Sequence, residues 1–135
     1  MFRAFPLFVL LLIAYNVMLF TGDVRAMLAS EIHTFDLISG AVWTLHASDL
    51  LLAFGVLMLY LEVFKSTNTG MQSVVDHALS MAVFVIFLVE FLVVEACGTS
   101  TFFILGLMSL VDVVAGFTVS IAGARRDFTY GGQGH

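Results

Sequence analysis

Residues 101–124 read TFFILGLMSLVDVVAGFTVSIAGA and stop at Arg125-Arg126. The run is long enough to cross a lipid bilayer as one helix, because a helical span needs about 20 apolar residues. It holds one ionisable residue, Asp112, close to its centre. The stretch therefore predicts a transmembrane helix with one acidic side chain inside the bilayer.

Three more apolar runs precede it, at about residues 5–20, 41–64 and 74–97. The whole chain of 135 residues is 61% hydrophobic and 11% charged, whereas soluble proteins carry about 25% charged residues. These runs predict an all-α polytopic membrane protein, a four-transmembrane-helix bundle that forms one domain over residues 1–135. Since only residues 98–100 separate the last two spans, these should form an antiparallel helical hairpin.

Net charge and motifs exclude several function classes. Ten acidic residues against five Lys and Arg give a formal net charge of −5, which argues against a nucleic-acid partner. The single cysteine, Cys97, allows no intrachain disulfide. The chain carries no P-loop, GxGxxG, CxxC or HExxH pattern, so no motif indicates a cofactor.

Basic residues predict the orientation, because cytoplasmic loops carry an excess of Lys and Arg. In the four-span arrangement Arg3, Lys65, Arg125 and Arg126 fall on one side and Arg25 falls on the other. Both termini are therefore expected to be cytoplasmic. The expected location is a bacterial inner membrane, with an organelle membrane as the alternative.

The segments outside the spans contain few residues that indicate their structure. Residues 23–40 form the longest outer loop, and their apolar positions recur at roughly helical spacing, which predicts an amphipathic segment at the membrane interface. A lid over the bundle is the alternative for this loop. Residues 24–26 loosely resemble a signal-peptide cleavage site, but the apolar run before them favours a retained span. The Gly-rich tail, residues 127–135, is expected to be mobile.

Five polar residues in the spans could meet in one place. At about 1.5 Å per residue, Asp49 and Glu90 lie roughly 12 Å and 10 Å below the outer ends of their spans. The candidate polar or cation site therefore consists of Asn16, His46, Asp49, Glu90 and Asp112. It would be deepest at Asp112 and open toward the outside.

Two interpretations of this candidate site remain open. Ionisable residues inside a membrane point to function by default, which favours a proton or cation site. The alternative is a set of protonated carboxyl groups that hydrogen-bond between helices and fix their register. His46, Asp49 and Glu90 are also weak candidates for a divalent metal site, because imidazole and carboxylate groups suit zinc or manganese. Glu62 and Lys65 are interpreted as an interfacial ion pair.

Small residues on the last span predict close helix packing. Gly106, Ser109, Gly116, Ser120 and Gly123 follow at steps that place them with Asp112 on one face of the helix. Small side chains allow helix backbones to approach closely in lipid, where packing drives association. Asp112 is therefore expected to face protein.

Three hypotheses on function follow. The first is a non-enzymatic accessory or scaffold subunit of a larger membrane complex, with the lipid bilayer and other membrane subunits as partners. The alternative is an oligomeric translocator of protons, cations or metal ions that uses the intramembrane carboxylates, with a second copy of the chain as partner. An enzyme or redox carrier that uses the region of His46 and Asp49 has the least support.

Overall fold

The computed structural model describes residues 5–67 and 71–132. Its elements are α1 (Phe8–Thr21), α2 (Val24–Ala29), β1 (Glu31–Asp36), β2 (Val42–His46), α3 (Ala47–Lys65), α4 (Met71–Val93), the 3₁₀ helix η2 (Glu95–Cys97) and α5 (Ser100–Gly132). Three expectations lie outside the described residues: the position of Arg3, residues 68–70 of the turn after the second span, and residues 133–135 of the tail.

Within residues 5–67 and 71–132, three helices are long and apolar enough to cross a membrane: α3, residues Val74–Val93 of α4, and residues Ser100–Gly123 of α5. The predicted helical membrane protein is confirmed at this level. The first predicted span becomes α1, an apolar helix of 14 residues. A helix of that length extends about 21 Å, which is shorter than the bilayer's hydrocarbon core of about 30 Å.

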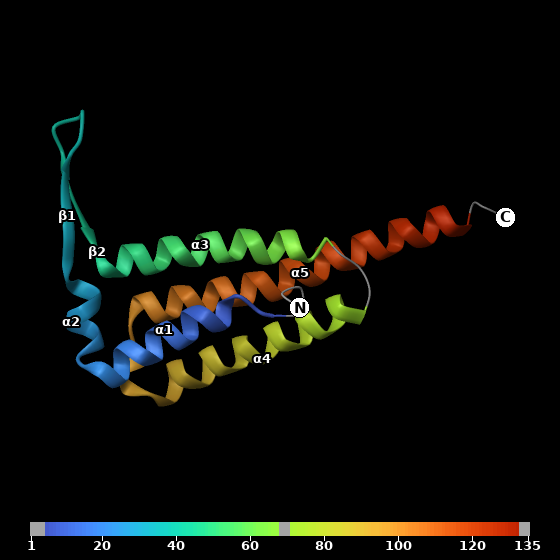
Figure 1. The fold of residues 1–135 in the computed structure, drawn as a ribbon, viewed down its shortest axis with the longest axis horizontal. Helices are drawn as coiled ribbons and strands as arrows, with labels where there is room; N and C mark the ends of the chain where they lie inside the picture. Colours follow the sequence, from blue (N-terminus) through green and yellow to red (C-terminus); the bar gives the residue numbers. More distant parts are fainter. Residues whose placement is uncertain (1–4, 68–70, 133–135) are drawn as a thin grey trace.

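The helices form an elongated bundle in which α5 packs along both α3 and α4. In Figure 1, α3 and α5 run in one direction while α1 and α4 run in the other. One end carries the β-strands and the turn between α4 and α5, and is called the hairpin end here. At the other end α3 stops and α4 starts; it is called the Lys65 end.

Aromatic and aliphatic side chains fill the centre of the bundle. The buried core comprises Phe8, Leu11, Leu12, Tyr15, Val24, Leu28, Val83, Phe87, Cys97, Phe102 and Leu105. Gly55 allows α3 and α5 to pack closely, because a Cβ atom on Gly55 would lie 2.7 Å from the Met108 sulfur of α5. Packing of this kind is what joins helices in lipid.

The segment 23–40 differs from its predicted amphipathic form. It folds into the short helix α2 and then into strand β1, which pairs with β2 in an antiparallel hairpin. Both strands are rich in β-branched and aromatic residues, which fit a pleated ribbon better than a helix. Gly40 takes a φ of 91° in the connecting turn, a conformation that glycine adopts without steric cost. The second span consequently begins at Ala47 and not at residue 41.

The last two spans also have different ends from those predicted. The third helix stops at Val93, and residues 94–99 make the turn through η2. The fourth helix continues beyond residue 124 to Gly132, so the first part of the expected loose tail is helical. Arg125 and Arg126 end the apolar run, but arginine favours helix. The basic pair therefore marks the end of the apolar span without ending the helix.

Candidate functional site

The strongest polar cluster lies inside the Lys65 end. The Lys65 ammonium nitrogen is 3.1 Å from Glu62 Oε1 and 3.3 Å from Asp76 Oδ1. The side chains of Glu62 and Asp76 are only 1% and 4% exposed. The predicted pair of Glu62 and Lys65 therefore exists, but it is buried between α3 and α4 and not exposed at an interface.

The same cluster holds the start of α1. The backbone N–H of Leu7 donates to Glu62 Oε1 at 2.6 Å, and Lys65 donates to the backbone carbonyl of Phe5. The first N–H groups of a helix have no partner within the helix. Glu62 supplies that partner, so the carboxylate connects α1 to α3 as well as binding Lys65.

A chain of hydrogen bonds lies next to these charges. The Ser120 hydroxyl donates to the carbonyl of Ser66 at 2.9 Å, and its oxygen is 2.6 Å from His77 Nε2. Because a serine hydroxyl has one proton to donate, the Nε2–H of His77 must be the donor in the second bond. Gly116 makes room for the ring, since a Cβ atom there would lie 3.1 Å from His77 Cε1.

Asp112 belongs to this end of the bundle. It is 4% exposed, and it lies one helical turn before Gly116, which faces His77 and Ser66. Glu62, Lys65, Asp76, His77 and Asp112 are called the Lys65 cluster below.

The small residues that were predicted to pack α5 closely lie along its contacts with α3 and α4. Gly106 faces Phe87, while Gly116 faces His77 and Ser66. Ser120 bonds to residues of both α3 and α4. Ser109 is 1% exposed, and its Oγ is the buried side-chain polar atom that lacks a hydrogen-bond partner in the described part of the chain. Gly123 lies at the edge, beside Thr67 and Ala122.

A second polar contact lies toward the hairpin end. Asn16 Nδ2 donates to Glu90 Oε2 at 3.0 Å and to the carbonyl of Leu12 at 2.8 Å. Cys97 is fully buried in the turn that follows α4. Burial, and to a smaller extent the negative charge of Glu90, raises the pKa of the Cys97 thiol to about 11.

His46 and Asp49 have a local role at the start of α3. The backbone N–H of His46 donates to Asp49 Oδ2 at 3.0 Å, and His46 Nδ1 is 3.5 Å from the same oxygen. A carboxylate in the first helical turn accepts from backbone N–H groups and suits the positive end of the helix dipole. Both side chains are about two-fifths exposed. Since α3 begins at Ala47, Asp49 lies at the helix end and not deep in the span.

The five predicted site residues are thus divided among three places. Asn16 contacts Glu90, His46 contacts Asp49, and Asp112 lies in the Lys65 cluster. Along α4, the buried apolar residues Val83 and Phe87 separate Glu90 from the Lys65 end.

The predicted metal site is not assembled. Among the described residues, no group of three or more His, Cys, Asp and Glu side chains is placed to hold a metal ion.

Sequence reasoning missed Asp76 and His77 as partners of the site. One signal was available, because a short connection from the second span to the third places Lys65 and Asp76 at the same end of the bundle. The helix rotation that buries their side chains was not readable from the sequence.

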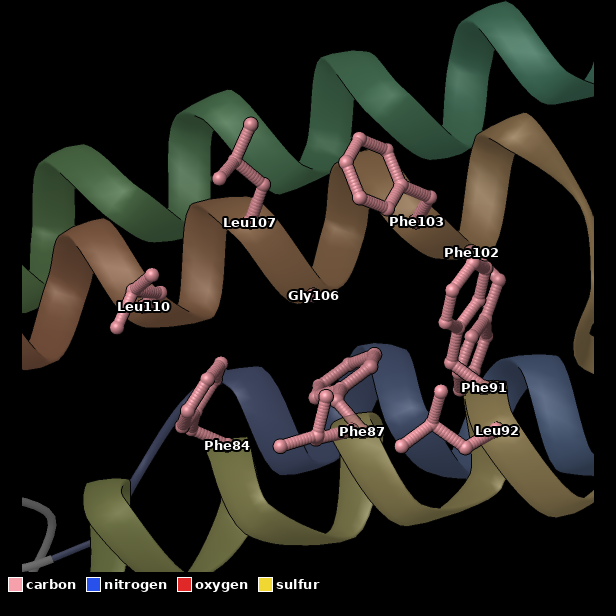
Figure 2. A pocket seen from close by; sticks show the side chains of 10 residues that line it. Phe84, Phe87, Phe91, Leu92, Phe102, Phe103, Gly106, Leu107 and Leu110 are labelled. Carbon is pink, nitrogen blue, oxygen red and sulfur yellow. The ribbon is translucent and has the colours of Figure 1, made fainter.

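An apolar groove lies between α4 and α5. Figure 2 shows residues that line it, among them Phe84, Phe87 and Phe91 from α4 and Phe102, Gly106 and Leu110 from α5. No lining residue carries a polar side chain. The groove therefore suits hydrocarbon and provides no group for acid–base chemistry.

Comparison of the chain with family models, with curated proteins and with solved structures gives no match.

Proposed function

We propose that this chain is a non-enzymatic accessory subunit of a larger membrane complex, and that it docks to its partner through the β1–β2 hairpin. The observation that carries the proposal is the exposure of that hairpin. Every residue from Glu31 to Trp43 is exposed, and Figure 1 shows the ribbon standing away from the bundle, across the direction of the helices.

An isolated two-stranded hairpin is marginally stable at best in water, so an external surface must support this one. Phe35 and Trp43 stack on one side of it with ring centroids 5.4 Å apart, and Ile38 at the turn is fully exposed. Exposed apolar side chains grouped in this way indicate an interaction surface. A neighbouring membrane subunit is the proposed occupant.

The test is purification of the chain from its native membrane in a mild detergent. We expect other chains to co-purify in fixed stoichiometry, and we expect the double variant Phe35→Ala, Trp43→Ala to lose them. Thr34→Ser is the matched control, because Thr34 alternates with Phe35 along β1 and so lies on the other side of the ribbon. Recovery of the chain alone, or partners that remain bound to the double variant, would contradict the proposal.

The proposed placement has four crossings, with α1 as the fourth, and cytoplasmic termini in a bacterial inner membrane. Lys65 and Arg125 lie toward one end of the bundle and Arg25 toward the other, which supports this orientation. A thiol reagent that cannot cross the membrane should label Ser39→Cys from outside intact cells. Labelling of that variant only after lysis would reverse the orientation.

A proton, cation or metal translocator is the second candidate, favoured by the buried carboxylates of the Lys65 cluster. In the described part of α4 the buried apolar residues Val83 and Phe87 lie between that cluster and Glu90, so this candidate places the path between copies of the chain. Flux into liposomes that is lost with Asp112→Asn would support this candidate, and undiminished flux in the variant would contradict it.

A further inference from the structure

The β1–β2 hairpin has a free edge along β1. In an antiparallel pair of strands, residue pairs that exchange two backbone hydrogen bonds alternate with pairs whose N–H and C=O groups point away from the other strand. The N–H of Leu37 donates to the carbonyl of Ala41 at 2.9 Å, which makes this a bonded pair. One and three positions back along the register, Asp36 and Thr34 therefore lie in unbonded pairs. Their backbone N–H and C=O groups point outward, away from β2.

Nothing in the described part of the chain covers this edge. Every residue of β1 is exposed, whereas residues 44–46 of β2 are half-buried. The outward groups of Thr34 and Asp36 receive no other backbone bond within the described residues. Natural proteins guard such an edge with lysine, proline or a bulge. β1 contains neither residue, and its bulge lies at its start, between Glu31 and His33, so the rest of the strand stays open.

The ribbon lacks a third strand. Two strands alone are marginally stable at best, and three or more are needed for independent stability. Residues 31–46 contribute no side chain to the bundle core in the described structure, so the core does not replace that strand. A strand added along β1 would take up the outward backbone groups and would lie beside Phe35, which already stacks on Trp43. The edge therefore fits an extended backbone segment, the ligand that main-chain bonds of this kind recognise.

The charges beside the edge select the kind of strand. Glu31 and Asp36 lie at the two ends of β1, and neither makes an ion pair within the described residues. Two antiparallel copies of β1 would place Glu31 of one copy near Asp36 of the other, and like charges across strands are destabilising. Lysine or arginine on the added strand would instead match both acids. Charge complementarity thus favours a basic segment of another protein over a second copy of this chain.

We propose that the outer edge of β1 takes up an extended segment of the partner subunit as a third strand, and that this segment carries lysine or arginine beside Glu31 and Asp36. The inference rests on the proposed function, because it names the chemistry by which the hairpin docks. Main-chain bonds to Thr34 and Asp36 supply the attachment, whereas the two acids and the ring of Phe35 select the sequence of the added strand.

Proline substitutions on the two edges of the ribbon test this pairing in the full chain, purified from its native membrane. Thr34→Pro removes an outward N–H of β1, and Thr44→Pro removes the equivalent N–H of β2. Both variants lose the same contact between the two threonine hydroxyls, which are 3.4 Å apart. Proline is tolerated on an edge where the N–H faces solvent. We expect Thr34→Pro to lose the co-purifying subunit and Thr44→Pro to retain it.

Amide hydrogen exchange, measured residue by residue, gives a readout that needs no variant. The amides of Thr34 and Asp36 should exchange fast in the isolated chain and should be protected in the complex, because a third strand accepts their hydrogen bonds. Recovery of the subunit should also fall as the salt concentration rises, since contacts between exposed charges are screened by salt.

Several results would overturn the proposal. Retention of the subunit by Thr34→Pro, alongside its loss from the Phe35→Ala, Trp43→Ala variant, would leave docking through the hairpin intact and exclude strand addition. Equal loss from both proline variants would show that β1 is not the edge that pairs. Fast exchange of the Thr34 and Asp36 amides in the complex would exclude the third strand directly. A second copy of this chain on the edge would contradict the basic occupant, whereas recovery of the chain alone would contradict the proposed function itself.

Discussion

Two ion pairs of similar geometry lie at opposite ends of the bundle. Arg25 and Glu95 approach to 3.4 Å at the hairpin end, where their side chains are 50% and 92% exposed. Lys65 and Glu62 approach to 3.1 Å at the other end, where theirs are 17% and 1% exposed. Exposed pairs contribute little because water screens them, whereas breaking a buried pair leaves a charge that nothing solvates. Burial, more than distance, thus separates a surface contact from a candidate site.

The largest expected effect comes from removing the buried cation. Lys65→Leu leaves the carboxylates of Glu62 and Asp76 without their partner, which should cost about 3–5 kcal/mol of stability. Arg25→Leu is the matched change at the hairpin end and should cost no more than about 1 kcal/mol. Unfolding temperatures in nanodiscs measure both. Equal losses of stability in the two variants would contradict the claim that the Lys65 pair is buried and the Arg25 pair is screened by water.

A smaller difference is expected between two glycines of α5. A Cβ atom on Gly116 would lie 3.1 Å from His77 Cε1, whereas one on Gly106 would lie 3.7 Å from its nearest neighbour. Gly116→Ala should therefore destabilise the bundle by about 1–3 kcal/mol through overpacking. Gly106→Ala should be neutral or stabilising by up to about 1 kcal/mol, because alanine favours helix. The opposite order would mean that α4 and α5 pack differently.

The smallest effect concerns the Cys97 thiol near the hairpin end. Since its pKa is raised to about 11, only about one thiol in ten thousand is ionised at neutral pH. The thiolate is the reactive form, so a maleimide should modify folded protein slowly, and faster as the pH approaches that pKa. Ser39→Cys, in the exposed turn, is the rapidly labelled control. Equally fast labelling of native Cys97 would contradict its burial.

Much of the helical frame was predictable, because an apolar run long enough to span a bilayer permits few other structures. The hairpin was not, since Ile32, Phe35 and Ile38 also fit helical spacing and only pairing with residues 42–46 selects the strand. The prediction that this loop lies at the interface as an amphipathic segment was therefore wrong in its secondary structure. The shift of the second helix start to Ala47 follows from the same pairing.

The candidate site was predictable in part. Depth estimates brought Asn16 near Glu90, and a contact between them is present. They could not place Asp112, because depth is readable from sequence while the rotation of each helix depends on packing. Residues such as Gly55 and Gly116 set that packing through contacts with distant parts of the chain. Asp76 and His77 were passed over for the same reason.

A double-mutant cycle of Lys65→Leu and Asp76→Asn, measured by unfolding in nanodiscs, tests most directly whether the Lys65 end holds one buried charged cluster. Residues in direct buried contact couple, whereas distant residues contribute independently. We predict a coupling of about 1.5 kcal/mol or more, and a clearly smaller value for the matched cycle of Arg25 and Glu95. Additive losses for Lys65 and Asp76 would contradict the buried charged cluster at the Lys65 end.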